Sequence, residues 1–194
     1  MGKVIFDTSM SLDGFMTASN RRPEEPMGDG GQRLHEWAFG EDERDRELLE
    51  DAVEALGAVI AGRTTYDDSA PWWGADGPTG SARRPVFVVT HDAPAESPEA
   101  GGVYTFVTDG IESALEQAKA AAGEKIVTVM GGASIRQQYI AAGLVDEISV
   151  HLVPVLLGSG TRMFEHLGSD HIQLEPIEVI GTRSATHLRF RIAG

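Results

Sequence analysis

Three short segments that are almost wholly apolar, residues 58–61, 86–90 and 126–130, constrain the fold of this chain more than any other feature. Near-continuous apolar runs of this length are typical of strands in a sheet that is covered on both faces. Apolar residues at helical spacing precede the first and the last of them, over residues 43–56 and 111–122. This alternation predicts an α/β sheet built from right-handed crossovers.

The C-terminal part of the chain has a different pattern. Residues 146–157, 172–182 and 185–192 are all strand-like and are joined by short turns. Together with a first strand over residues 4–10, they predict a sheet that is finished by an antiparallel C-terminal hairpin at one edge. A length of 194 residues suits one hydrophobic core, so we expect a single domain over residues 1–194.

The chain is strongly acidic. Its 16 Lys and Arg against 30 Asp and Glu give a net charge of −14, which repels nucleic acid and anionic membranes. Twelve of the acids and only three arginines lie in residues 24–54, so an anionic ligand must bind elsewhere. The absence of cysteine excludes a disulfide scaffold and suits a reducing compartment. Because the N-terminus is not leader-like and no long apolar segment occurs, we expect a cytoplasmic protein.

Glycine and small polar residues follow the first of the three apolar segments. In open α/β sheets, ligands gather at the carboxyl ends of strands, where loops lead into helix N-termini. Gly62 lets a ligand approach the backbone, and Arg63 offers a planar fork for a phosphate. Thr64 or Thr65 can cap a short helix that ends before Pro71. An ordinary turn with a surface arginine and a capping threonine is the structural alternative.

Two further strand ends carry similar signals. Gly131 and Gly132 leave room for a pyrophosphate against the backbone, and Ser134 can cap the helix that follows. Thr90 and His91 offer a hydroxyl and an imidazole that can hold a phosphate or a ribose. A tight strand-to-helix turn and a solvated loop histidine are the respective alternatives.

Several familiar sites are absent from the sequence. The signatures of P-loop NTPases, Rossmann dehydrogenases, α/β-hydrolases and zincins do not occur. The later histidines lack the compact spacing of metal ligands. We therefore expect core or surface roles, and no metal site, for His151, His166, His171 and His187.

Five segments of the chain, taken in order, are SLDGF, VIAGRTTYD, VFVVTH, VMGGASI and DEISVHLVPVLLGSGTRMF. Together they resemble the dihydrofolate reductase-like superfamily, and they are most similar to its branch related to the reductase domain of riboflavin biosynthesis. The resemblance implies a single three-layer α/β domain with a mostly parallel eight-stranded sheet, helices on both faces and a C-terminal antiparallel hairpin. It also implies NADPH as the cofactor, bound in an extended pose.

The resemblance further implies which residues bind the cofactor. Arg63 would be the charge partner of the adenosine 2′-phosphate and would favour NADPH over NADH. At the second pyrophosphate loop, family members often carry a strained Gly-Gly peptide, which costs about 3–4 kcal/mol when it is cis. The cofactor-binding residues implied in this way are Gly62, Arg63, Thr64, Thr65, Thr90, His91, Gly131, Gly132, Ala133 and Ser134.

The same resemblance implies hydride transfer to a C=N or C=O carbon of a pyrimidine-like, pteridine-like or carbonyl substrate, with the protein supplying a proton. Dihydrofolate reductases have a Leu-Pro-Trp loop followed by an acidic residue, whereas this chain has PMGDGGQRLHEWAF in that region. Asp13 and Glu36 are the catalytic candidates, with Asp42 as a third. The expected substrate-binding residues are His35, Trp37 and Tyr66.

The missing Leu-Pro-Trp loop leaves other functions open. One is a catalytically weak module that binds or senses NADPH, and another is an unrelated α/β protein that binds a nucleotide or phosphate. A ribose phosphate would need further basic residues, for which Arg136 and Arg162 are candidates, although both are expected at the surface. The Val-rich terminal strands and residues 145–157 are expected to pair across a two-fold axis in a homodimer.

Overall fold

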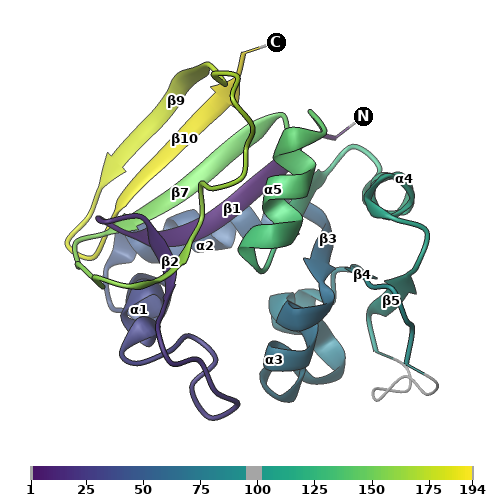
Figure 1. Ribbon diagram of the computed structural model, residues 1–194, viewed down its shortest axis with the longest axis horizontal. Helices are drawn as coiled ribbons and strands as arrows, with labels where there is room; N and C mark the ends of the chain where they lie inside the picture. Colours follow the sequence, from purple (N-terminus) through teal and green to yellow (C-terminus); the bar gives the residue numbers. More distant parts are fainter. Residues whose placement is uncertain (1, 95–101, 194) are drawn as a thin grey trace.

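The computed structural model describes residues 2–94 and 102–193. Within these residues, eight strands form one sheet in the order β5-β4-β3-β6-β1-β7-β10-β9 (Figure 1). These strands are β1 Val4–Ser11, β3 Leu56–Gly62, β4 Val86–Val89, β5 Tyr104–Val107, β6 Ile126–Met130, β7 Glu147–Val153, β9 Leu174–Gly181 and β10 Thr186–Ile192. A separate two-stranded sheet consists of β2 Phe15–Ala18 and β8 Gly160–Arg162.

The direction of the strands changes at the C-terminal edge of the sheet. Strands β5, β4, β3, β6, β1 and β7 run parallel. Strand β10 pairs antiparallel with β7, and β9 pairs antiparallel with β10, which confirms the predicted hairpin. Because β7 is paired on both sides, residues 145–157 offer no free strand edge along β7 to a second copy, and the expected pairing through this segment cannot be edge to edge.

Helices cover both faces of the sheet, as predicted (Figure 1). They are α1 Glu36–Phe39, α2 Glu43–Ala55, α3 Arg63–Trp73, α4 Ile111–Ala122 and α5 Ala133–Ala141, with the 3-10 helices η1 Gly31–His35 and η2 Gly74–Ala82. Helices α4 and α5 pack on one face. Helix α3 packs on the other face beside β3 and β4, and α1 and α2 contact that face near β7 and β10. The architecture has three layers.

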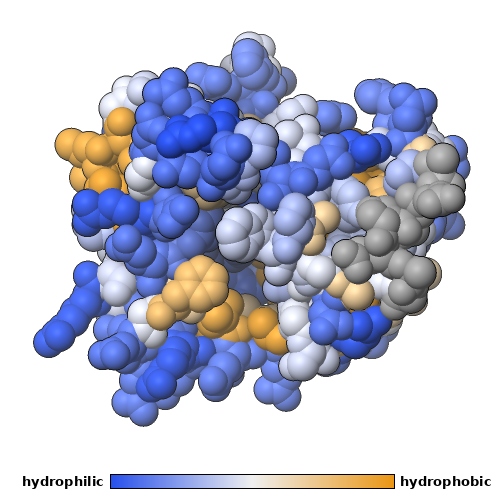
Figure 2. All heavy atoms as spheres, turned by 90° about the horizontal axis from the view of Figure 1, so that it is seen from below, coloured by the Kyte–Doolittle hydropathy of each residue, from blue (hydrophilic) through white to orange (hydrophobic). Residues whose placement is uncertain are grey.

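Seen from below, the surface of the molecule is mostly hydrophilic, and hydrophobic residues form small separate patches (Figure 2). This agrees with the large excess of acidic residues in the sequence. In the part of the chain that the structure describes, no helix has the length and apolar character needed to cross a membrane.

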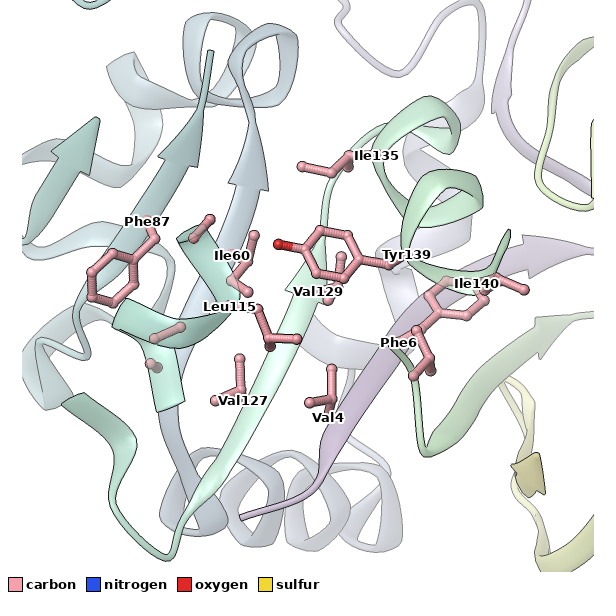
Figure 3. Close-up of a cluster of buried hydrophobic side chains, with 14 of the residues drawn as sticks. Val4, Phe6, Ile60, Phe87, Leu115, Val127, Val129, Ile135, Tyr139 and Ile140 are labelled. Atoms are coloured by element: carbon pink, nitrogen blue, oxygen red, sulfur yellow. The ribbon is translucent and has the colours of Figure 1, made fainter. Parts of the chain in front are cut away.

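The main hydrophobic core lies between the sheet and the helices α4 and α5 (Figure 3). Phe6 and Val129 point from neighbouring strands toward Leu115 of α4 and Tyr139 of α5. The Tyr139 hydroxyl donates a hydrogen bond to the Ile111 carbonyl at 2.7 Å, so its polar end is satisfied. Burial of each large apolar side chain stabilises the fold by about 1.5–3 kcal/mol. This face therefore has a structural role, and it holds the strand ends in place.

Some local predictions need correction. The second helix ends at Ala55, because Leu56 already pairs in β3. Helix α3 does not stop before Pro71 but continues to Trp73, since a proline in the last turn removes only one helical hydrogen bond. Two short strands, β2 and β8, are absent from the prediction, and β8 begins at Gly160. Strands β2 and β8 have four and three residues, too few to show a periodicity.

The sheet opens beside the C-terminal half of β1. Strand β6 pairs with β1 only as far as Phe6 and Val129, whereas β7 stays paired with β1 as far as Ser11. From Asp7 onward, β1 therefore has a strand partner on one side only. Openings between neighbouring strand ends are where open α/β sheets bind ligands, so this one positions the candidate site.

Candidate functional site

The loops that follow β3 and β6 touch each other. The Gly132 N–H donates a hydrogen bond to Thr65 Oγ1 at 2.8 Å. Gly131 has a φ of 113°, and a Cβ at this position would lie 2.5 Å from Thr65 Oγ1, so only glycine fits without rearrangement. Two loops that the sequence places at separate strand ends thus form one surface.

Two helix N-termini open at this surface. Gly62 is the N-cap of α3 and Gly132 is the N-cap of α5, and neither helix start has a side-chain cap. The prediction that Thr64, Thr65 or Ser134 caps a helix is wrong, because a glycine occupies each cap position. The first N–H groups of a helix carry partial positive charge and attract anions. The two N-termini can therefore serve one anionic ligand.

The start of α5 differs from the geometry that the resemblance implies. No peptide bond in residues 2–94 and 102–193 is cis, so the Gly131-Gly132 peptide is trans. Ala133, the first residue of α5, is buried. Ser134 is exposed, and its Oγ accepts a hydrogen bond from Gln138 Nε2 at 3.3 Å. Of these residues, the two glycines present backbone to the neighbouring loop.

Polar contacts link the start of α3 with the end of β4. Arg63 Nε donates to both carboxylate oxygens of Asp67, at 2.8 and 2.9 Å, and Arg63 Nη1 donates to the Asp92 carbonyl at 3.0 Å. The hydroxyl of buried Thr90 donates to the same carbonyl at 3.0 Å, whereas His91 is exposed. The three predicted cofactor segments therefore lie at one edge of the sheet, with the Arg63 guanidinium held among them.

Arg136 of α5 is buried, which corrects the expectation of a surface arginine. The residue is 5% exposed, and its guanidinium lies 5.0 Å from the Phe6 ring centroid and 3.9 Å from Met163 Sδ. Its Nε has no hydrogen-bond partner among the described residues. Burial lowers the pKa of Arg136 to about 10, and the charge of Asp7 opposes this shift. A buried cation without a paired anion is costly, so this side chain suits a ligand that brings one.

The predicted catalytic carboxylates Asp13 and Glu36 have different surroundings. Asp13 accepts hydrogen bonds from Ser11 Oγ at 2.6 Å and from the Gly158 N–H at 2.7 Å. These contacts, the one with Ser11 above all, lower the pKa of Asp13 to about 2. Glu36 is exposed at the start of α1. The third candidate, Asp42, is the N-cap of α2. The catalytic roles of Asp13 and Glu36 stay predictions.

Two of the three predicted substrate-binding side chains lie near β1 and β7. Trp37 is buried, its ring centroid lies 4.1 Å from that of His151, and its Nε1 donates to Ser9 Oγ at 2.9 Å. His35 is half-buried, and burial lowers its pKa. Tyr66 packs instead in the separate hydrophobic cluster between α3 and β3–β5. The structure therefore does not bring Tyr66 together with the other two.

Four titratable side chains form a continuous chain that sequence reasoning missed. His151 lies between Asp7 and His187, with its Nε2 3.1 Å from Asp7 Oδ2 and its Nδ1 2.7 Å from His187 Nδ1. His187 Nε2 in turn lies 2.8 Å from Asp45 Oδ1. Across the described residues, no three or more His, Asp and Glu side chains gather as metal ligands. The sequence carries no clear signal for this chain of contacts, because β1 and β10 each contain several polar residues besides Asp7 and His187.

Asp7 is the end of this series of four side chains that reaches the opening in the sheet, and its side chain is 41% exposed. Burial by itself raises the pKa of Asp7, but the electrostatic interaction and hydrogen bond with His151, together with a hydrogen bond with Ser149, outweigh it and lower the pKa to about 2. Asp7 directly follows Phe6, whose partner Val129 precedes Gly131 by two residues. The Asp7 carboxylate therefore lies at the same end of the sheet as the loops that follow β3 and β6.

A model of the RibD C-terminal domain family matches residues 2–186 of this chain. No curated protein matches the sequence. Among solved structures, a putative riboflavin biosynthesis protein from Shewanella sp. PV-4 is similar, with a TM-score of 0.75, 20% identity and complete coverage of both chains.

Two more distant structures share the fold. The diaminohydroxyphosphoribosylaminopyrimidine deaminase/5-amino-6-(5-phosphoribosylamino)uracil reductase of Thermotoga maritima has a TM-score of 0.68 at 15% identity, and the match covers 99% of this chain and 57% of that one. A dihydrofolate reductase from Enterococcus faecalis, solved with NADP(H), has a TM-score of 0.64 at 14% identity, with coverage of 100% and 98%. The fold is therefore that of dihydrofolate reductase.

Proposed function

Because the chain belongs to the family of RibD C-terminal domains, we propose that it is an NADPH-dependent reductase of a small pyrimidine-like, pteridine-like or carbonyl substrate. The observation that carries the proposal is the contact between Thr65 and Gly132, which brings two helix N-termini together. Paired N-termini at neighbouring strand ends suit the two phosphates of a dinucleotide.

The residues at this surface fit NADPH, which supplies a hydride from its nicotinamide C4 when bound. The backbone N–H groups at the starts of α3 and α5 would hold the pyrophosphate, with Gly131 allowing the close approach of Thr65 that brings the two helix starts together. Arg63 would bind the 2′-phosphate beside Thr90 and His91. Its partner Asp67 is exposed, and exposed ion pairs contribute only about 0–1 kcal/mol, so a phosphate can replace that carboxylate.

The substrate would lie at the opening beside β1, with Asp7 and Arg136 as its polar contacts. The Asp7 carboxylate accepts hydrogen bonds, and the Arg136 guanidinium donates them. A planar ring with N–H groups on one side and a carbonyl or anionic oxygen on another satisfies both. This pair of contacts supports a heterocyclic substrate, such as a pyrimidine or pteridine, over a simple carbonyl compound.

A second candidate function is binding or sensing of NADPH without turnover. It is supported by the surroundings of the two predicted proton donors, because Asp13 is engaged by Ser11 and Gly158 and Glu36 is exposed. Such a module would bind the cofactor and leave it reduced whatever compound is added.

Titration with NADPH tests the proposal, followed by energy transfer from tryptophan to the bound nicotinamide. Saturable binding at micromolar cofactor supports it, and no signal at high-micromolar NADPH would contradict it. Loss of NADPH absorbance is then measured with a panel of pyrimidines, pteridines and small carbonyl compounds. Oxidation with any of them supports the reductase, whereas binding without oxidation across the panel favours the sensing module.

A further inference from the structure

The side chains of Asp7, His151, His187 and Asp45, here called the proton chain, come from four elements of the structure, β1, β7, β10 and α2. Their exposure falls along the chain, from 41% for Asp7 and 13% for His151 to 7% for His187 and 0% for Asp45. One end of the proton chain thus opens at the proposed substrate position, and the other end is closed off from water.

Trp37 holds the two imidazole rings in place. Its ring centroid lies 4.1 Å from that of His151 and 5.0 Å from that of His187. The Trp37 indole is itself fixed by its hydrogen bond to Ser9 Oγ. Because these rings are packed, the positions of the protons are set by the hydrogen bonds of the proton chain.

Three hydrogen bonds in a row need three protons, and two neutral imidazoles bring only two. The 2.7 Å contact between the Nδ1 atoms of His151 and His187 takes a proton from one ring. That neutral ring then has no proton on the nitrogen that faces its own carboxylate, where two lone pairs would meet. The geometry therefore requires one proton more than two neutral rings and two ionised carboxylates contain.

The closed end is the favourable resting place of the extra proton. Asp45 is fully buried and its Oδ2 has no hydrogen-bond partner in the described part of the chain, so a negative charge there is costly. Burial, opposed by the contact with Asp45, lowers the pKa of His187 and disfavours an imidazolium at that ring. Asp7, at the open end, is 41% exposed and lies 3.1 Å from His151 Nε2, so water and a hydrogen bond from His151 stabilise its carboxylate as the anion. In this state Asp45 donates to His187 Nε2, His187 Nδ1 donates to His151 Nδ1, and His151 Nε2 donates to Asp7.

We propose that the proton chain stores one proton at Asp45 and delivers one through Asp7 to the substrate as the substrate accepts its hydride, an inference that rests on the proposed reductase function. The Asp45 proton moves to His187 Nε2 and the His187 Nδ1 proton moves to His151 Nδ1. The His151 Nε2 proton moves to Asp7. Asp7 then protonates the nitrogen or oxygen of the substrate, so that C=N becomes CH–NH, or C=O becomes CH–OH, while NADPH becomes NADP⁺.

The proton chain recovers its proton at the open end. After delivery, His151 Nε2 and the Asp7 carboxylate face each other with lone pairs only, which favours uptake of a proton from water at Asp7. The other titratable groups that influence Asp7 are Arg136 and His35. Neither replaces Asp7 as an acid, because Arg136 keeps its proton to a pKa of about 10, and burial lowers the pKa of His35 and so disfavours its protonated form. Asp7 is thus the catalytic residue, and the other three are positioning residues.

The resting arrangement is tested without substrate or cofactor, by long-range ¹H–¹⁵N NMR of the histidine side chains in the full chain. We expect two neutral rings of opposite tautomer, with the proton on Nδ1 in His187 and on Nε2 in His151. A His187 ring that carries a proton on Nε2 at neutral pH would overturn the proposed resting state.

Delivery is tested with Asp45→Asn. The asparagine amide donates to His187 Nε2 as the acid does, so all three hydrogen bonds survive, but the amide proton cannot be released. We expect kcat to fall about 100-fold or more, the usual contribution of a general acid, with an altered pH profile and an unchanged Kd for NADPH. Asp51→Asn is the matched control on the same helix, and it keeps kcat because Asp51 is exposed and lies outside the proton chain.

The outcomes distinguish a failure of proton delivery from a failure of the reductase function. If Asp45→Asn keeps the kcat and pH profile of the unmodified chain, delivery is overturned and the reductase function stands. If the variant fails to fold, Asp7→Asn takes its place, and an unchanged kcat there overturns delivery equally. If the unmodified chain oxidises no NADPH with any compound, the reductase function fails and delivery fails with it, while the NMR experiment still decides whether the proton is stored.

Discussion

The contact between the loops after β3 and β6 can be broken by one methyl group, in Gly131→Ala. The backbone φ of 113° at this residue is one that an L-residue with a Cβ rarely adopts. The added Cβ would lie 2.5 Å from Thr65 Oγ1 and 3.0 Å from Thr65 Cβ. Thr65 must therefore move, and the hydrogen bond that it accepts from Gly132 is lost.

The loss of stability in Gly131→Ala has two parts, the strain at a positive φ and the lost hydrogen bond between Gly132 and Thr65. A side chain at such a φ costs about 1–2 kcal/mol. Loss of one hydrogen bond costs a further 0.5–1.5 kcal/mol or so. We therefore expect the free energy of unfolding to fall by about 2–3 kcal/mol. Because the same contact aligns the two helix N-termini, we expect the Kd for NADPH to rise about tenfold or more, which corresponds to about 1.4 kcal/mol.

Urea denaturation and NADPH titration measure both quantities. Gly110→Ala is the control, because Gly110 has a similar φ of 98° but a Cβ there would meet nothing nearer than Glu112 Oε2 at 3.7 Å. Gly110→Ala should lose only the stability that a side chain at a positive φ costs, and it should keep its affinity for NADPH. In a Thr65→Ala background, the Gly131 change should cost less, since the clashing hydroxyl is gone. Equal losses in the two glycine variants, with NADPH affinity unchanged in both, would refute the reasoning.

Three further predictions concern the cofactor, pH and assembly. Arg63→Ala should weaken the binding of NADPH about 10- to 100-fold and the binding of NADH far less, because it removes a charge-assisted contact to the extra phosphate. Titrations that show equal losses of affinity for the two cofactors would contradict that role. The free energy of unfolding should fall as the pH drops below about 6.5, because burial lowers the pKa of His35 and His187 and the unfolded chain then binds more protons than the folded one. Urea titrations at several pH values measure this. His35→Gln should reduce the slope of the free energy of unfolding against pH. We also propose a homodimer through the edge strand β9, where Val179 is 64% exposed, so Val179→Lys should give a monomer by light scattering, and an unchanged mass would count against this interface.

Much of the scaffold could be predicted from local patterns of apolar residues and glycines in the sequence. Apolar runs predicted β3, β4 and β6, and the helical spacing of Ile111–Ala122 predicted α4 with its bounds. The glycines after β3 and β6 marked the loops that now touch, and at Gly131 glycine is needed because the backbone lies close to Thr65. What the pattern did not contain is which side chain faces which, as with Tyr66, which packs in the core.

The residues that give the site its chemistry depend on contacts between distant parts of the chain. Arg136 is buried because Phe6 and Met163 close over it, and nothing in the residues next to Arg136 signals this. His151 meets His187 only because β7 and β10 pair in one register, and a shift by one residue would turn either ring to the opposite face.

By itself, the sequence determined the strands, the helices and the two glycine loops of this protein, because those depend on the spacing of apolar residues and on backbone freedom within a few positions. Only the tertiary structure decided that Asp7, two histidines and Asp45 lie within hydrogen-bond distance of one another, and that one arginine is buried with no ion-pair partner among the described residues. Hydrogen bonding and desolvation act over a few ångströms in space, and the fold alone brings residues that are far apart in the chain within that range.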